Sequence, residues 1–299
     1  MLGGGRLFHV NVNCADLARS RQFYVEGIGL VEGVRTTPGA VQDGSAFGLE
    51  SAQWDAWILL GRRGYEGGAI DLLQWQAPAP LGAPPSAPND NGFQRLGFGV
   101  PDLDAAMRSL THSGGTVWGE PTVHRSDVAG EVRVVHASDP DGVAVELFEG
   151  RGPELTFVSV VCSDLERSLA WYAALGFEEI ARFSSSGADG AHLRLDGAYA
   201  FHEIMLAPPG GGRVSVLLVG FDAPPARSAP LRPANALGIW RAAFLVPDVD
   251  GAHAEFASAG IAAISTPVEM AMGPGLPGLR FVCFRGPDGE VLELIETPR

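Results

Sequence analysis

The feature that most constrains this chain is an internal repeat. The segment FHVNVNCADLARSRQFY, which begins at Phe8, returns as TFVSVVCSDLERSLAWY at Thr156, a shift of 148 residues. The segment DPDGVAVELFE from Asp139 returns as GPDGEVLELIE from Gly286, a shift of 147 residues. A repeat at near-constant spacing indicates a tandem duplication. The 299 residues of the chain are enough for two ordinary domains.

Each half is itself made of two related units. Every unit starts with a strand of period two, and the pattern that follows predicts β-α-β-β-β. An aspartate stands at each expected helix N-cap: Asp16, Asp102, Asp164 and Asp248. A glycine follows each expected helix: Gly27, Gly114, Gly176 and Gly260. Proline-rich connectors from Ala77 and Asp222 join the units within each half, and EGRGPE from Glu149 joins the halves.

The charge and composition exclude several classes of function. The net charge is −14, which opposes binding to nucleic acid or to an anionic membrane. All 21 cationic residues are arginine, so a lysine Schiff base with pyridoxal phosphate and a P-loop lysine are excluded. No apolar run is long enough to span a bilayer or to act as a signal peptide. We therefore expect a cytoplasmic protein with a small-molecule ligand and no nucleotide cofactor.

The strand–Asp–helix–Phe-Tyr opening and the DPDG…E close resemble the vicinal oxygen chelate superfamily, which includes glyoxalases, extradiol dioxygenases, epimerases and bleomycin-resistance proteins. The resemblance covers almost the whole chain. It implies an α+β fold of four βαβββ modules in two tandem domains, residues 1–150 and 151–299. Each domain would be a curled mixed sheet around a cavity with helices outside. The family's ligand positions lie on the first strand, seven residues before the Asp, and on the last strand of a module.

Carried onto this chain, the resemblance gives two unequal sets of residues. The N-terminal half presents a polar set: His9, Asp71, Arg95 and Glu146. The C-terminal half presents a poorer set: Phe157, either Ser215 or Val216, Arg241 and Glu293. Strand alternation places His9, Asn11 and Asn13 on one face, and Phe8, Val10, Val12 and Cys14 on the other. We therefore expect one competent pocket in residues 1–150, and a scaffold or substrate-closing role for residues 151–299.

The first set suggests specific roles. One imidazole and two carboxylates, His9, Asp71 and Glu146, suit a divalent metal such as Mn, Fe, Ni or Zn, although the cation Arg95 opposes a metal beside it. Catalytic candidates are His9, Glu146 and Arg95, and substrate-binding candidates are Asn11, Arg95, Trp54 and Trp75. A structural interpretation treats Arg95–Glu146 and Arg241–Glu293 as buried ion pairs. The segment EMAMGPGLPG from Glu269 is expected to be a loop or lid over the C-terminal cavity.

The predicted function is a lyase- or isomerase-type reaction on a small oxygenated organic anion, such as glyoxalase-like isomerisation, epimerisation or a biosynthetic tailoring step. Arg95 would hold the anion, Glu146 or Asp71 would move a proton, and His9 would ligate a metal or act as an acid–base partner. The alternative is a metal-free binding protein of the bleomycin-resistance type. An extradiol dioxygenase is less favoured, because the family's dioxygenases carry a second histidine where Arg95 stands. Either a monomer or a homodimer fits the sequence.

Overall fold

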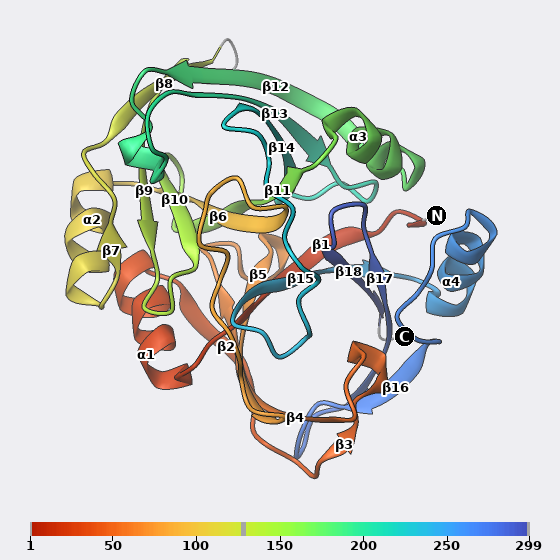
Figure 1. The fold of residues 1–299 in the computed structure, drawn as a ribbon. Coiled ribbons are helices and arrows are strands. Elements are labelled where there is room, and N and C mark those ends of the chain that lie inside the picture. Colours follow the sequence, from red (N-terminus) through yellow and green to blue (C-terminus); the bar gives the residue numbers. More distant parts are fainter. Residues whose placement is uncertain (1, 127–129, 298–299) are drawn as a thin grey trace.

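The computed structural model describes residues 2–126 and 130–297, and it contains four units of the predicted type. We call them modules 1 to 4, and they span residues 6–77, 92–149, 154–223 and 238–296. Their strands form two curled sheets, one above the other in Figure 1, with the helices α1 to α4 outside them. This arrangement confirms the predicted α+β fold class.

The first sheet combines modules 1 and 4. Module 1 supplies β1 (Arg6–Asn13), β5 (Ala69–Ala77), β4 (Ser51–Leu60), β2 (Val31–Thr36) and the short β3 (Gln42–Asp43). Module 4 supplies β15 (Gly238–Val246), β18 (Val291–Glu296), β17 (Gly278–Arg285) and β16 (Val268–Ala271). The two modules join where β1 pairs antiparallel with β15.

The second sheet combines modules 2 and 3. Module 2 supplies β6 (Gly92–Val100), β10 (Ala144–Glu149), β9 (Gly130–Ser138), β7 (Thr116–Val117) and β8 (Thr122–Ser126). Module 3 supplies β11 (Glu154–Cys162), β14 (Ser215–Ala223), β13 (Tyr199–Ala207) and β12 (Glu178–Gly187). These modules join through the antiparallel pair β6 and β11.

Each sheet therefore takes one module from each half of the sequence, and the expectation that each half closes its own sheet is wrong. The division at residue 150 stays a prediction about how the sequence is repeated. The physical reason lies in the connections. Only residues 150–153 separate β10 from β11, so modules 2 and 3 must be neighbours. Residues 78–91 and 224–237 are long enough to cross between sheets, and they run side by side through bridges at Leu81–Ala236 and Asp90–Arg227.

The helices begin where the sequence predicts. They are α1 (Leu17–Gln22), α2 (Leu103–His112), α3 (Leu165–Ala174) and α4 (Val249–Ser258), and each N-cap aspartate accepts a backbone N–H in the first turn. The first helix continues through a π-helical turn, η1 (Phe23–Ile28), and ends at Gly29 with φ 96°, not at Gly27. Single 3₁₀ turns are η2 (Ser45–Phe47), η3 (Gly64–Glu66) and η4 (Ala191–Leu193). Within the described residues, no helix has the length and apolar character needed to cross a membrane.

The DPDG and GPDG turns hold the helix of the preceding module. Asp141 accepts hydrogen bonds from the Ala15 backbone N–H and the Ser20 hydroxyl, 3.1 and 2.9 Å away. Asp288 does the same for the Ser163 backbone N–H and the Ser168 hydroxyl, at 2.8 and 2.7 Å. The same contact therefore occurs in both halves of the chain, and it fixes each odd-numbered module on the even-numbered module that follows it.

A buried tyrosine–carboxyl pair lies beneath each of these turns. The Tyr24 hydroxyl donates to Asp139 over 3.1 Å, and the Tyr172 hydroxyl donates to Glu290 over 3.1 Å. Burial, the largest effect, raises the pKa of Asp139 and that of Glu290 to about 7, despite the backbone N–H groups that favour the charged form. These two carboxyls make the stability of the fold depend on pH. They do not line the cavity described next.

Candidate functional site

The pairing of modules 1 and 4 brings together side chains that the sequence had separated. His9 on β1 lies opposite Ala243 on β15, and Asp71 on β5 lies beside Asn11. Arg241 on β15 and Glu293 on β18 complete the group from module 4. We call the curled sheet of modules 1 and 4 the first cup, and the four residues His9, Asp71, Arg241 and Glu293 its floor.

Arg241 binds both carboxylates of the floor. Its Nε donates to Glu293 Oε2 and its Nη2 donates to Asp71 Oδ2, each over 2.8 Å. His9 Nε2 lies 3.4 Å from Glu293 Oε2 and 3.8 Å from Asp71 Oδ2. All four side chains are almost inaccessible to solvent, so these charges act on one another with little screening.

Several polar atoms of the floor have no hydrogen-bond partner. They include both ring nitrogens of His9 and the Nη1 atom of Arg241. Because buried polar groups are normally paired, unpaired atoms in residues that line a cavity favour a polar group of a ligand, or a water, at this end of it. Asn11 is fully buried next to Asp71, and its amide donates to the backbone and side-chain oxygens of that residue over 3.2 Å. Asn11 therefore positions Asp71 and does not line the cavity, contrary to its predicted contact with substrate.

The charge of Arg241 keeps Glu293 ionised. Burial raises the pKa of Glu293, but the Arg241 charge and the nearby His9 outweigh this effect and hold that pKa below its usual value. Burial lowers the pKa of Arg241, but the charges of Glu293 and Asp71 raise it by more than that, so the guanidinium stays charged. Glu293 is accordingly a carboxylate at neutral pH and a weak base.

An apolar cavity of about 360 Å³ opens above this floor. Its wall is mostly aromatic and aliphatic, with side chains from both modules: Phe8, Val34, Phe47, Trp54, Ile58, Tyr65, Leu73, Trp75, Leu245, Met272, Leu276, Pro277, Leu279, Phe281 and Ile295. A concave apolar site with a few polar groups at one end is typical of small-molecule binding. Trp54 and Trp75 lie in this wall, and their contact with a substrate stays a prediction.

Two parts of the wall differ from the expectation. The segment from Glu269 contributes Met272, Leu276 and Pro277 to the cavity that contains His9, whereas a place over the cavity of residues 151–299 was expected. Phe8 also lines the cavity beside His9, although simple alternation places it on the opposite face. A β-bulge between Leu7 and His9 accounts for this, because it shifts the alternation of β1.

The second cup, formed by modules 2 and 3, has the equivalent positions but little space. Phe157 on β11 replaces His9, and Leu217 on β14 replaces Asp71, since Ser159 pairs with Leu217 as Asn11 pairs with Asp71. The expected equivalents of Asp71, Ser215 and Val216, are therefore wrong by one or two residues. Phe157 and Leu217 belong to a buried apolar cluster, and about 40 Å³ is left beside Arg95.

Arg95 and Glu146 lie in this second cup, away from His9 and Asp71. Arg95 Nε donates to Glu146 Oε2 over 2.8 Å, and its Nη2 also binds Glu203 of module 3. His136 Nε2 lies 3.2 Å from the same Glu146 oxygen. Burial raises the pKa of Glu146, but Arg95 and His136 outweigh it and hold the pKa at about 2. The expected single pocket of His9, Asp71, Arg95 and Glu146 is thus wrong, because β1 pairs with β15 and not with β6.

The predicted metal ligands do not fit a metal ion. Glu146 belongs to the other sheet, so it cannot join His9 and Asp71. In residues 2–126 and 130–297 no group of three His, Cys, Asp or Glu side chains is arranged to hold a metal. The nearest set, His9, Asp71 and Glu293, surrounds Arg241, whose guanidinium already neutralises one carboxylate charge and would repel a divalent cation.

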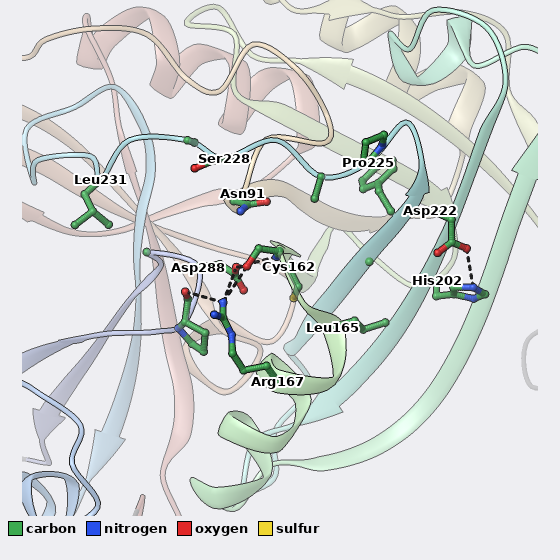
Figure 2. Close-up of a pocket in the computed structure, with 17 residues that line it drawn as sticks. Asn91, Cys162, Leu165, Arg167, His202, Asp222, Pro225, Ser228, Leu231 and Asp288 are labelled. Carbon is green, nitrogen blue, oxygen red and sulfur yellow. Dashed lines mark hydrogen bonds and ion pairs between the residues drawn. The ribbon is translucent and has the colours of Figure 1, made fainter.

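A larger open groove of about 620 Å³ lies between module 3, the connector that follows it and the turn before β18 (Figure 2). Its charged groups are paired with one another: Arg167 with Asp288 over 3.4 Å, and His202 with Asp222 over 3.0 Å. The first pair is repeated in the other half of the chain by Arg19 and Asp141, which indicates an architectural role. The first cup is therefore the better candidate for a functional site.

Sequence comparison agrees with this architecture. The family model for the glyoxalase/bleomycin resistance protein/dioxygenase superfamily matches residues 6–147 and 154–294. The chain belongs to this superfamily. No curated protein sequence matches the chain at a significant level.

Solved structures show the same fold for almost the full length of this superfamily member. Glyoxalase I from Zea mays is 19% identical with a TM-score of 0.66, and the match covers 98% of this chain and 92% of that one. A putative dioxygenase from Bacillus subtilis is 12% identical with a TM-score of 0.63, covering 98% of this chain and 86% of that one. Identities this low support a shared fold but do not identify the reaction, which has to be inferred from the residues of the site.

Sequence reasoning assigned Arg241 and Glu293 to a scaffold, yet they complete the site around His9. One signal could have located them. The short connection between modules 2 and 3, compared with the long connectors inside each half, favours a sheet made of these two modules. Module 4 is then left as the partner of module 1, and its polar positions face His9.

Proposed function

We propose that this superfamily member catalyses a lyase- or isomerase-type proton transfer on a small oxygenated organic molecule bound in the first cup. The observation that carries the proposal is His9, a buried imidazole at an apolar cavity whose two ring nitrogens have no hydrogen-bond partner. An imidazole in this state can take a proton from a substrate and return it. The expected role of His9 in acid–base chemistry is thereby kept, with different partners.

The other floor residues support the proton transfer. When His9 accepts a proton, Glu293 and Asp71, at 3.4 and 3.8 Å, stabilise the imidazolium. Arg241 holds these carboxylates in place, and its free Nη1 can donate to an oxygen that becomes negative in the transition state. Removal of a proton next to a carbonyl and its return to a neighbouring atom is an isomerisation. Removal with loss of a leaving group is a lyase reaction.

The predicted divalent metal has no part in this proposal, because Arg241 stands where a cation would bind. Arg95 and Glu146, predicted as catalytic residues, are proposed to act as a buried ion-pair network in the second cup.

A second function, binding without chemistry, is favoured by one observation. The cavity wall is dominated by apolar and aromatic side chains, and the carboxylates of the floor are occupied by Arg241. Such a site could hold a flat molecule and release it unchanged. We place this proposal second, because a pure binding site has no need of a buried histidine whose ring nitrogens make no hydrogen bond.

Hydrogen–deuterium exchange distinguishes the two functions without a known substrate. A panel of uncharged ketones and aldehydes is incubated with the protein in D₂O, and exchange beside the carbonyl is followed by NMR. We expect faster exchange for at least one compound, and loss of that rate in His9→Ala. His136→Ala, which changes a buried histidine of the second cup, is the matched control and should keep the rate. Binding without exchange would support the second function, and neither binding nor exchange would contradict both.

A further inference from the structure

The charge of the first cup limits which molecules can enter it. Among the described residues that line the cavity, Arg241 is the one arginine, and it faces the two carboxylates of Asp71 and Glu293. Together, Asp71, Glu293 and Arg241 carry one negative charge more than positive charge. The whole chain, at −14, adds a field of the same sign.

Arg241 cannot easily release a carboxylate to bind an anion. Both of its contacts are 2.8 Å long, and both partners are almost fully buried. Exchanging Asp71 or Glu293 for a ligand carboxylate would separate a buried carboxylate from the guanidinium that neutralises it, which is strongly unfavourable. Its Nη1 atom is the donor atom without a partner, and one donor atom suits the single oxygen of an uncharged head group.

The wall of the cavity also disfavours a charged ligand. It presents mostly carbon atoms to the ligand, so a charged ligand would lose its hydration without new partners. The aromatic rings of Phe8, Trp54 and Tyr65 offer contact area to a flat apolar body.

We propose that the first cup takes an uncharged molecule with an aromatic or apolar body and one oxygen-bearing head group, and that it excludes anions of the same shape. The head-group oxygen is placed between Arg241 Nη1 and His9. The inference rests on the proposed function, which assigns the ligand to this cavity. It replaces the anionic substrate expected from the sequence, because that expectation depended on Arg95.

Two probes of the same shape test the inference: 1-naphthamide, which is uncharged, and 1-naphthoate, which is anionic at pH 8. Their affinities for the full chain are measured by isothermal titration calorimetry. We expect naphthamide to bind and naphthoate to bind at least about tenfold more weakly, as like-charge repulsion at a poorly screened site would cause. Asp71→Asn, which removes one negative charge of the floor, should reduce the ratio of the naphthoate and naphthamide dissociation constants several-fold.

The control is Asp222→Asn, which removes the same charge at an exposed position on the other sheet and should leave the ratio unchanged. Naphthoate binding as tightly as naphthamide would overturn this inference and leave the proposed function standing. An equal effect of Asp71→Asn and Asp222→Asn would overturn the role of the floor. If neither probe binds, the cavity assignment fails together with the inference. Should Asp71→Asn not fold, the ratio for the unaltered chain decides alone.

Discussion

The first and second cups are built from equivalent strands, yet one encloses a cavity and the other is filled. In the first cup, His9 lies opposite Ala243; in the second, Phe157 lies opposite Gly97. A Cβ atom added at Gly97 would lie 2.1 Å from the Phe157 ring. The ring therefore occupies the space beside a residue that has no side chain, and the cup closes into a core.

The arginine–carboxylate pair occurs in both cups, unlike the cavity and its histidine. Arg241 pairs with Glu293 and Arg95 pairs with Glu146, at the same Nε–Oε2 distance of 2.8 Å. What is common to both cups is thus architectural, and what differs between them is the histidine and its space. The role of a residue at a family ligand position can therefore be inferred only when the module that faces it is known.

The largest expected effect is that of Arg241→Met. It would leave Asp71 and Glu293 buried without a cation, so the free energy of unfolding should fall by about 3–5 kcal/mol, measured by urea denaturation. Adding Glu293→Gln should recover part of the loss. A single variant as stable as the unaltered chain would show that the ion pairs do not hold the floor together.

Phe157→Ala and His9→Ala compare the two cups directly. Phe157 is 4% exposed and packs in the second cup, so its truncation should cost about 3–5 kcal/mol of stability. His9→Ala should cost much less, because the ring borders a cavity and makes no hydrogen bond. Equal losses in urea denaturation would mean that the first cup is packed as a core.

A change that makes the first cup resemble the second is His9→Phe. Because Ala243 carries the Cβ that Gly97 lacks, the ring should be overpacked and cost about 1–3 kcal/mol. The double variant His9→Phe with Ala243→Gly should regain most of this, less the ordinary cost of a glycine in a strand, about 0.5–1 kcal/mol. A double variant that is less stable than His9→Phe in thermal unfolding would contradict the role given to Ala243 and Gly97.

The last prediction concerns the buried tyrosine–carboxyl pair, which occurs in both halves. Asp139 and Glu290 have pKa values raised from 3.8 and 4.5 to about 7, so the folded chain binds more protons than the unfolded chain between these values. Their contribution to the free energy of unfolding therefore falls as pH rises from about 4 to about 7, by at most about 1.4 kcal/mol per pH unit for each group.

Urea denaturation across this pH range measures the slope. Glu290→Gln should remove about half of it, and Asp139→Asn should remove the other half, since the tyrosine pairs are equivalent. A slope that survives both substitutions would assign the titration to other groups.

The sequence by itself determined the repeat, the four modules and their fold. Period-two strands, the aspartate N-caps and the Asp-Gly turns are local signals, because each depends on residues close in the chain. Glu146 and Glu293 were also located correctly on the last strand of their modules. His9, Trp54 and Trp75 line one cavity, and their roles there stay predictions.

Only the tertiary structure decided which modules share a sheet, and with it which side chains meet. His9 could face Arg95 or Arg241 with the same local pattern, since both stand at equivalent positions of equivalent strands. The choice depends on the pairing of β1 with β15 across the chain, a long-range contact that strand periodicity does not encode. The charge of the site, and hence the kind of molecule it admits, follows from that pairing.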